Sequence, residues 1–205
     1  MYAVHKPRSV HISRQRAQSG DRSPTPREAR VADRRVECLV SRHWDYCWAV
    51  FSRENEQSSR PLFDGDVLAK GLPAPVAQLR ERIRRAHGVI FATPEYNFSI
   101  PGVLKNALDW ASRGDDQPFA LKPVAILSAS PGPLGGARVQ YDLRKVMLFM
   151  NALVMIKPEV FIGAAAGKFD ADGRCTDEST RKFVADQMLS FQRWIGAVNR
   201  MSSQV

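Results

Sequence analysis

Residues 88–113 constrain the fold more than any other part of the sequence. They begin with a short apolar run at residues 89–92, continue through a loop that contains two prolines, and end in an amphipathic stretch. A run of β-forming residues bounded by Gly and Pro predicts a buried parallel strand. Pro101 suits the first position of a helix, and Ser99 suits a residue that caps its free N–H groups. The loop is therefore expected at the carboxyl edge of a sheet, where open α/β sheets bind ligands.

The same order of strand, loop and helix returns at residues 124–153. Residues 124–127 form a second apolar run, and residues 128–136 (SASPGPLGG) follow as a loop of small residues. Glycines permit a positive φ and a close approach of the backbone. A helix is expected from about residue 137 to residue 153, with a Met- and Leu-rich face that suits a core or a subunit interface. Because the two loops follow consecutive strands, we expect them to line one pocket.

Further helices and strands extend this alternation. A helix from about residue 75 to residue 86 carries an apolar stripe, and its arginines at 80, 82 and 84 are expected on the solvent-exposed face. A strand is expected near residues 160–162, and Pro158 argues against an uninterrupted strand there. A last helix at about residues 178–199 has its apolar residues at helical spacing. This alternation predicts an α/β protein with a doubly wound parallel sheet.

Several short motifs give the sequence a family resemblance. They are PEYN at 94–97, SIPG at 99–102, LKNALDW at 104–110, SAS at 128–130 and GGAR at 135–138. Together they resemble the NADPH-dependent FMN reductase family, which includes chromate and quinone reductases and some azoreductases. The resemblance covers residues 61–200. It implies a flavodoxin-like fold with strand order 2-1-3-4-5 and FMN at the switch between strands 1 and 3. Strands 1 and 2 are doubtful, because residues 1–60 do not match.

The resemblance also implies a chemistry and a set of cofactor contacts. The chemistry is hydride transfer from NADPH or NADH through FMN to a small-molecule acceptor, namely a quinone, chromate, an azo compound or free flavin. The implied cofactor-binding residues are Pro94, Glu95, Tyr96 and Asn97 in the first loop and Ser128, Ser130, Gly132 and Gly135 in the second. Asn97 would donate to the flavin, Tyr96 would flank the ring and Glu95 would fix the loop. No catalytic acid or base and no metal ligand is expected.

Residues 1–60 differ from the rest of the chain. They hold twelve basic residues, eleven of them Arg, but a single glycine, and residues 7–35 show no helical or strand periodicity. An apolar cluster appears only at residues 36–51. The family's Gly-Ser-x-Arg loop, which wraps the FMN phosphate at a helix N-terminus, is not found. Its nearest counterpart, HISRQR at 11–16, contains no glycine.

Three interpretations of residues 1–60 compete: a disordered Arg-rich arm, a nucleic-acid-binding arm, or translation out of frame with the rest. We favour the third, which leaves residues 61–205 as an incomplete flavodoxin-like domain. The missing loop predicts poor FMN binding. It also leaves an alternative to the reductase, a flavin-free remnant of the family without activity.

Charge and composition narrow the possible partners. The net charge of +9 divides into +5 (12 − 7) for residues 1–60 and +4 (18 − 14) for residues 61–205. The second part is only mildly basic, so it suits anionic substrates and gives no reason to expect a nucleic-acid partner. No run of 18 apolar residues and no secretory signal appears, so we expect a cytoplasmic protein without a membrane partner. The resemblance implies a homodimer or homotetramer, with Arg138, Tyr141 and Glu159 at positions that some relatives use between subunits.

Overall fold

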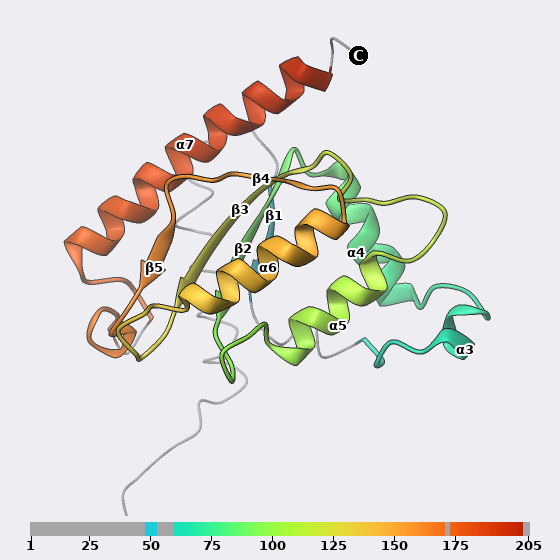
Figure 1. The fold of residues 1–205 in the computed structure, drawn as a ribbon, viewed down its shortest axis with the longest axis horizontal. Helices are drawn as coiled ribbons and strands as arrows, with labels where there is room; N and C mark the ends of the chain where they lie inside the picture. Colours follow the sequence, from blue (N-terminus) through green and yellow to red (C-terminus); the bar gives the residue numbers. More distant parts are fainter. Residues whose placement is uncertain (1–47, 53–59, 171–172, 203–205) are drawn as a thin grey trace, which may run out of the picture.

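A computed structural model describes residues 48–52, 60–170 and 173–202. Helices and strands alternate along these residues (Figure 1). In chain order they are β1 (Trp48–Ser52), α3 (Gly65–Leu68), α4 (Ala74–Arg85), β2 (Gly88–Pro94), α5 (Gly102–Ala111), β3 (Pro123–Ala129), α6 (Ala137–Phe149), β4 (Leu153–Val154), β5 (Val160–Ile162), a 3₁₀ turn (Ala165–Gly167) and α7 (Glu178–Ser202).

The strands form one parallel sheet. β1 pairs with β2, and β2 pairs with β3 along its whole length, so that Pro94 lies beside Ala129. β4 pairs with the start of β3, and β5 pairs with its end. These two short strands therefore share one side of β3 and are separated by the segment that contains Pro158. This confirms the prediction that Pro158 interrupts the strand.

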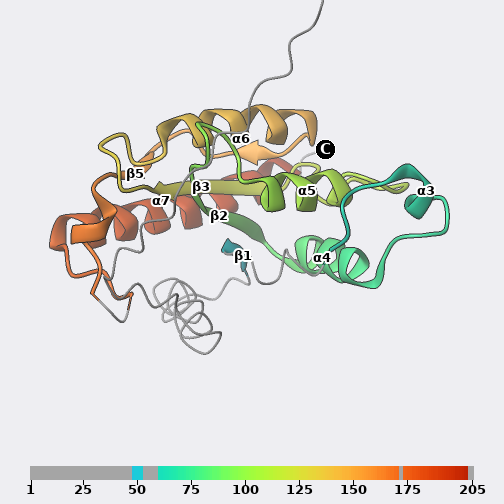
Figure 2. The ribbon, with the colours of Figure 1, turned by 90° about the horizontal axis from the view of Figure 1, so that it is seen from below.

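The sheet is covered by helices on both faces. Figure 2 shows α5 and α6 on one side of the sheet and α7 on the other. The β2 residues Val89 and Phe91 pack in a core with α4, α5 and α6, whereas Ile90 packs with α7 residues such as Phe191 and Ile195. This alternation follows from the two-residue period of a strand buried on both faces. The predicted doubly wound α/β class is confirmed.

β1 comes from the segment whose sequence did not match the family. It lies next to β2, which is the place that the flavodoxin-like order reserves for strand 1. Among the described residues, no strand lies beyond β1 to occupy the place of strand 2. Residues 1–47 and 53–59 lie outside the described residues, and with them most of the segment covered by the three interpretations of residues 1–60.

Arg80 is buried, which corrects the prediction that it faces solvent. Its side chain is 1% exposed, and its guanidinium donates to the main-chain oxygens of Ala111, Arg113 and Asp116 and to the Asp116 carboxylate. These acceptors lie where α5 ends. The sequence pattern of α4 alone does not reveal them, because they come from a segment more than thirty residues away.

α6 ends at Phe149, earlier than the predicted residue 153. Asn151 adopts a left-handed conformation, with φ of 55°, and the Ala152 N–H donates to the Met147 carbonyl at 3.0 Å. This is the hydrogen bond that closes a helix when Asn or Gly follows its last turn. Met147 and Met150 are buried as expected, whereas Leu148 and Phe149 are 80% and 75% exposed.

In the part of the chain that the structure describes, no helix is both long enough and apolar enough to cross a membrane.

Candidate functional site

The loop between β2 and α5 contains a tight, strained turn. Tyr96 and Ser99 exchange two main-chain hydrogen bonds of 3.1 and 3.0 Å, and the two residues between them, Asn97 and Phe98, have φ of 50° and 66°. Two consecutive positive φ values define a type I′ turn, which usually contains Asn and Gly. A bulky residue such as Phe98 is rarely found in this conformation, and such strain concentrates at functional sites.

Asn97 is exposed at the tip of this turn. Neither its side-chain amide nor its main-chain N–H has a hydrogen-bond partner among the residues that the structure describes. The turn thus presents donors at the carboxyl edge of the sheet. This is the arrangement that a planar heterocycle with acceptor atoms on its edge requires.

Glu95 joins this loop to the N-terminus of α6. One carboxylate oxygen accepts a hydrogen bond of 3.1 Å from the Val139 N–H, and the other lies 3.3 Å from the Arg138 guanidinium. A carboxylate is favourable there because the first N–H groups of a helix are unsatisfied and carry a partial positive charge. Arg138 also lies over the Phe98 ring at 4.0 Å. Glu95 and Arg138 thereby fix the first loop against α6, which agrees with the role expected for Glu95.

The loop between β3 and α6 is fastened to the end of β5. The Ser130 N–H donates to the Ile162 carbonyl at 3.0 Å, and the Ala164 N–H donates to the Gly132 carbonyl at 3.1 Å. Gly135 has φ of 58°, and a Cβ added there would lie 2.6 Å from the main-chain carbon of Phe161. Only glycine fits this position, because both the conformation and the space exclude a side chain.

Ser128, near the end of β3, supports this second loop through its side chain. It is buried, and its hydroxyl lies 2.6 Å from the Gly135 carbonyl and accepts a hydrogen bond of 2.7 Å from Gln140. The Ser130 hydroxyl instead lies at the surface, 3.3 Å from the Gly132 carbonyl. Of the two serines predicted to contact a cofactor, only Ser130 has its hydroxyl near the surface.

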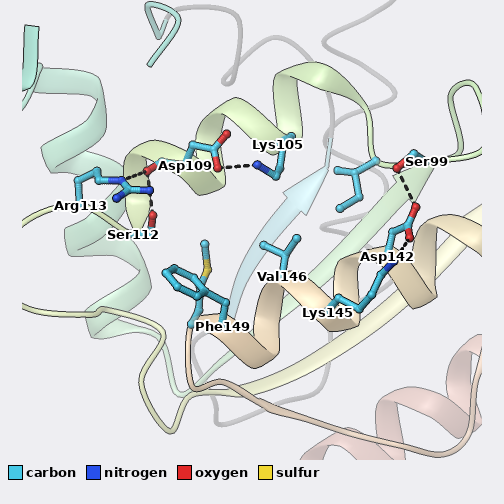
Figure 3. Close-up of a pocket in the computed structure, with 11 residues that line it drawn as sticks. Ser99, Lys105, Asp109, Ser112, Arg113, Asp142, Lys145, Val146 and Phe149 are labelled. Carbon is cyan, nitrogen blue, oxygen red and sulfur yellow. Dashed lines mark hydrogen bonds and ion pairs between the residues drawn. The ribbon is translucent and has the colours of Figure 1, made fainter. Parts of the chain in front are cut away.

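Ser99 does not cap α5, which corrects that prediction. Pro101 is the N-cap residue and makes no side-chain hydrogen bond, and the helix begins at Gly102. The Ser99 hydroxyl instead donates to the Asp142 carboxylate on α6 at 2.7 Å (Figure 3). Lys145 and Ser99 together lower the pKa of Asp142, because both stabilise its charged form. This bond is a second link between the first loop and α6.

A groove of about 500 Å³ lies between α5 and α6. Figure 3 shows the residues that line it. Its rims carry the paired charges Lys105–Asp109 and Asp142–Lys145, and its lining includes the apolar residues Val146 and Phe149. The groove reaches Ser99 and Ile100 of the first loop, but none of the eight predicted cofactor-binding residues lines it. It is therefore distinct from the face where the two loops meet.

The structure thus brings the predicted residues together at one edge of the sheet. Pro94 and Ala129 lie side by side where β2 and β3 end, so Glu95, Tyr96 and Asn97 neighbour the loop that contains Ser130, Gly132 and Gly135. Our sequence analysis did not assign roles here to Phe98, Gln140 or Asp142. The sequence signal for Phe98 is weak, and the other two act through partners distant in sequence.

Parallel strands, helices on both faces and two loops at neighbouring strand ends define a flavodoxin-like α/β protein, a class of fold that binds ligands at this edge of the sheet. The sequence profile of the NADPH-dependent FMN reductase family matches residues 49–167. The chain belongs to this family of oxidoreductases, whose cofactors are FMN and NAD(P)H. The match begins at residue 49, within β1. The motifs in the sequence predict a resemblance that begins only at residue 61.

Two curated relatives show the extent of the similarity. An NAD(P)H-dependent FMN reductase of Pseudomonas aeruginosa is 49% identical over 138 residues, which are 67% of this chain and 75% of the relative. A quinone reductase of Escherichia coli K12 is 48% identical over 140 residues, which are 67% of this chain and 74% of the relative. Among solved structures, the flavoenzyme NAD(P)H:(acceptor) oxidoreductase FerB of Paracoccus denitrificans has a TM-score of 0.68 and 30% identity. The similarity covers 87% of this chain and 93% of FerB.

The described residues fit the ring end of FMN. The first loop presents the donors of Asn97, and the second loop is a glycine turn that packs closely against the end of β5 and against Ser128. At the phosphate end, the first helix described after β1 is the four-residue α3, and residues 53–64 contain no glycine. Residues 53–59 lie outside the described part of the chain. The fit therefore concerns the ring end.

Proposed function

We propose that this protein is an NAD(P)H-dependent FMN oxidoreductase that reduces quinones. Membership of the FMN reductase family supports the proposal, as does the similarity to a curated quinone reductase. The observation that carries it is the pairing of two loops at the adjoining ends of β2 and β3, linked through α6 by Glu95. When bound, FMN supplies the hydride chemistry, accepting a hydride from NAD(P)H and reducing the acceptor.

The protein's own residues bind and orient the flavin. Pro94, Tyr96 and Asn97 form the wall of the first loop, with the Asn97 amide as the donor to the flavin edge. Ser130, Gly132 and Gly135 form the wall of the second loop, and Ser128 supports it from below. Glu95 sets the distance between the walls, because its carboxylate is bonded to α6. In this proposal no side chain transfers a proton.

We extend the proposal to further acceptors and to the assembly. The mild positive charge of residues 61–205 supports anionic partners such as NADPH and chromate, and azo compounds and free flavin are further acceptors to assay. We also propose a cytoplasmic location, and a homodimer or homotetramer that is supported by large apolar side chains exposed on and near α6. These are Tyr141, Leu148, Phe149 and Ile156. Light scattering on the purified protein measures the assembly directly.

The test of the proposed function is an assay of the full chain in excess FMN. Oxidation of NADH or NADPH is followed at saturating benzoquinone, and FMN binding is titrated by quenching of flavin fluorescence. Asn97→Gly removes the amide donor but keeps a residue that favours positive φ, so the turn stays intact. We expect this variant to weaken FMN binding about tenfold, the effect of one lost hydrogen bond. The control Asn199→Ala, at an exposed site on α7, leaves binding unchanged.

The alternative function is a flavin-free remnant of the family. It is favoured by one observation, the lack of glycine in residues 53–64, where the fold would place a phosphate-binding loop. The remnant predicts no quinone-dependent NAD(P)H oxidation at any FMN concentration. Turnover that rises with added FMN and falls in Asn97→Gly would eliminate it.

A further inference from the structure

Two buried glutamines, one on each face of the sheet, donate hydrogen bonds at the side of β3 where β4 and β5 pair with it. Gln140 of α6 donates to the Val160 carbonyl at 2.8 Å and to the Ser128 hydroxyl at 2.7 Å. Gln187 of α7 donates to the Ile126 carbonyl at 2.9 Å and to the Pro158 carbonyl at 3.0 Å. Both side chains are at most 1% exposed. Each therefore bridges β3 to the β5 side of the sheet, where pairing between the strands is interrupted.

The two glutamines share a further property. The side-chain oxygen of each is buried and has no hydrogen-bond partner among the described residues. A buried polar atom without a partner costs stability, and in each glutamine only the amide nitrogen makes hydrogen bonds that can offset this cost. The two side chains are thus alike in their burial, in their unpartnered oxygen and in the two hydrogen bonds that each donates.

The difference between them lies in what they reach. Gln187 donates both of its hydrogen bonds to main-chain carbonyls, and neither carbonyl belongs to the β2–α5 loop or the β3–α6 loop. Gln140 ends on Ser128, whose hydroxyl contacts the carbonyls of Gly135 and Gly136 at 2.6 and 3.1 Å. A chain of two hydrogen bonds thus runs from α6 to the glycine turn.

The chemistry of a serine hydroxyl determines which group donates and which accepts in these two hydrogen bonds. A hydroxyl has one proton to donate and can rotate to choose its acceptor. Because the Gln140 N–H donates to the Ser128 oxygen, the Ser128 proton is left to bond the carbonyl of Gly135 or Gly136. The turn also packs closely on Ser128, since a Cβ added at Gly136 would lie 2.8 Å from the Ser128 Cβ. Gln140 therefore determines how Ser128 holds the turn.

We propose that Gln140 is a positioning residue for the flavin site, acting through Ser128 on the glycine turn at residues 132–136. The inference rests on the proposed function, because that function makes this turn one wall of the flavin site. Gln140 itself touches neither the flavin face nor the first loop. Its contribution is to keep the main-chain groups of the turn in the geometry that receives the ring.

Gln187 supplies a matched control for the test. Gln140→Met and Gln187→Met each keep the length of the side chain and remove two donors to buried acceptors. We expect similar losses of stability in urea unfolding of the flavin-free protein. We expect Gln140→Met to raise the Kd for FMN about tenfold and to shift the visible absorption of the bound flavin. Gln187→Met should change the Kd less than about twofold and leave the spectrum unaltered.

A second measurement does not depend on FMN. In the flavin-free protein, hydrogen exchange of the amides at residues 134–137 should accelerate in Gln140→Met and stay as in wild type in Gln187→Met. If wild type bound no FMN, the proposed function would fail, and this measurement would still decide the role of Gln140. Exchange that is unchanged in Gln140→Met, or equal effects of the two variants on FMN affinity, would overturn the proposal.

Ser128→Ala covers the case in which Gln140→Met does not fold. It removes the other end of the same chain of hydrogen bonds with a smaller change in volume. It should weaken FMN binding to a similar degree, and where both single variants fold, the double variant should be no weaker than either. Additive effects in the double variant, or an FMN affinity in Ser128→Ala equal to that of wild type, would contradict the mechanism.

Discussion

At the scale of single residues, Arg80 shows how a charge can be kept inside the fold. A buried guanidinium is tolerated when its N–H groups are satisfied by hydrogen bonds. Arg80 meets this condition with the carbonyls at the end of α5 and the carboxylate of Asp116, although its Nε atom has no partner among the described residues. It therefore closes the C-terminus of α5 and fixes the loop that follows.

Arg80→Met should destabilise the protein by about 3 kcal/mol, because it leaves several buried carbonyls without donors. The measurement is urea unfolding followed by circular dichroism. Arg85→Met, at an exposed position on the same helix, should cost less than about 0.5 kcal/mol. Equal effects at the two positions would show that the buried network contributes nothing specific.

Asp116 makes part of this network depend on pH. Hydrogen bonding from Arg84, together with the charges of both Arg84 and Arg80, lowers the pKa of Asp116 to about 2. The folded pKa lies below the unfolded value of 3.8, so the contribution of Asp116 is fully present above about pH 4 and is lost as pH falls towards 2. The difference in stability between wild type and Asp116→Asn should therefore shrink over this interval.

At the scale of elements, α6 ties the two loops of the site together. Its N-terminus receives the Glu95 carboxylate, its first turn carries Arg138, and its middle provides Asp142 for Ser99 and Gln140 for Ser128. Because one rigid helix carries all four contacts, the first and second loops cannot move independently. The element that sets the geometry of the site therefore lies beside the loops and not within them.

Glu95→Gln tests this coupling. The substitution removes the negative charge at the α6 N-terminus and weakens the pairing with Arg138, so we expect a loss of about 1 kcal/mol in unfolding free energy. FMN affinity should fall with it, because the first loop is less firmly held. The control is Glu178→Gln at the exposed start of α7, where the loss should stay below about 0.5 kcal/mol. An unchanged FMN affinity in Glu95→Gln would contradict the coupling.

At the scale of the whole molecule, the described residues include both loops that we propose for the flavin ring, but the first helix described after β1 is the four-residue α3. β1 and β2 are neighbours, and α4 is the long helix described between them. A flavodoxin-like sheet with a second strand would instead place two helices and that strand in this interval. On the proposed function, the described residues therefore bind the ring end of FMN.

This arrangement predicts that the chain binds FMN and riboflavin with Kd values within about threefold of each other. A phosphate cradle would contribute several charge-assisted hydrogen bonds, each of about 1.5–3 kcal/mol, and would separate the two ligands by orders of magnitude. Parallel fluorescence titrations with the two flavins measure the ratio. A preference for FMN of a hundredfold or more would show that a phosphate anchor exists, in which case the prediction of poor FMN binding is wrong.

The strands, helices and loops of the site could be predicted because each carries its own signal. The apolar runs of β2 and β3 are buried on both faces, the stripe of α7 packs on the sheet, and both loops follow strand ends. The end of α6 is also predictable from the sequence, because Asn151 is a typical residue after the last helical turn. The predicted end at residue 153 instead follows the apolar pattern, which continues past Asn151.

The sequence by itself determined the class of the fold and the edge of the sheet at which its loops meet, since burial patterns and turn residues act within a few positions of the chain. Only the tertiary structure decided the partners of Arg80, Ser99 and Gln140, which lie 31, 43 and 12 residues or more away. The physical reason is that a polar side chain can pair with any suitable group that packing brings near. Its own neighbours in the sequence do not specify which group that will be.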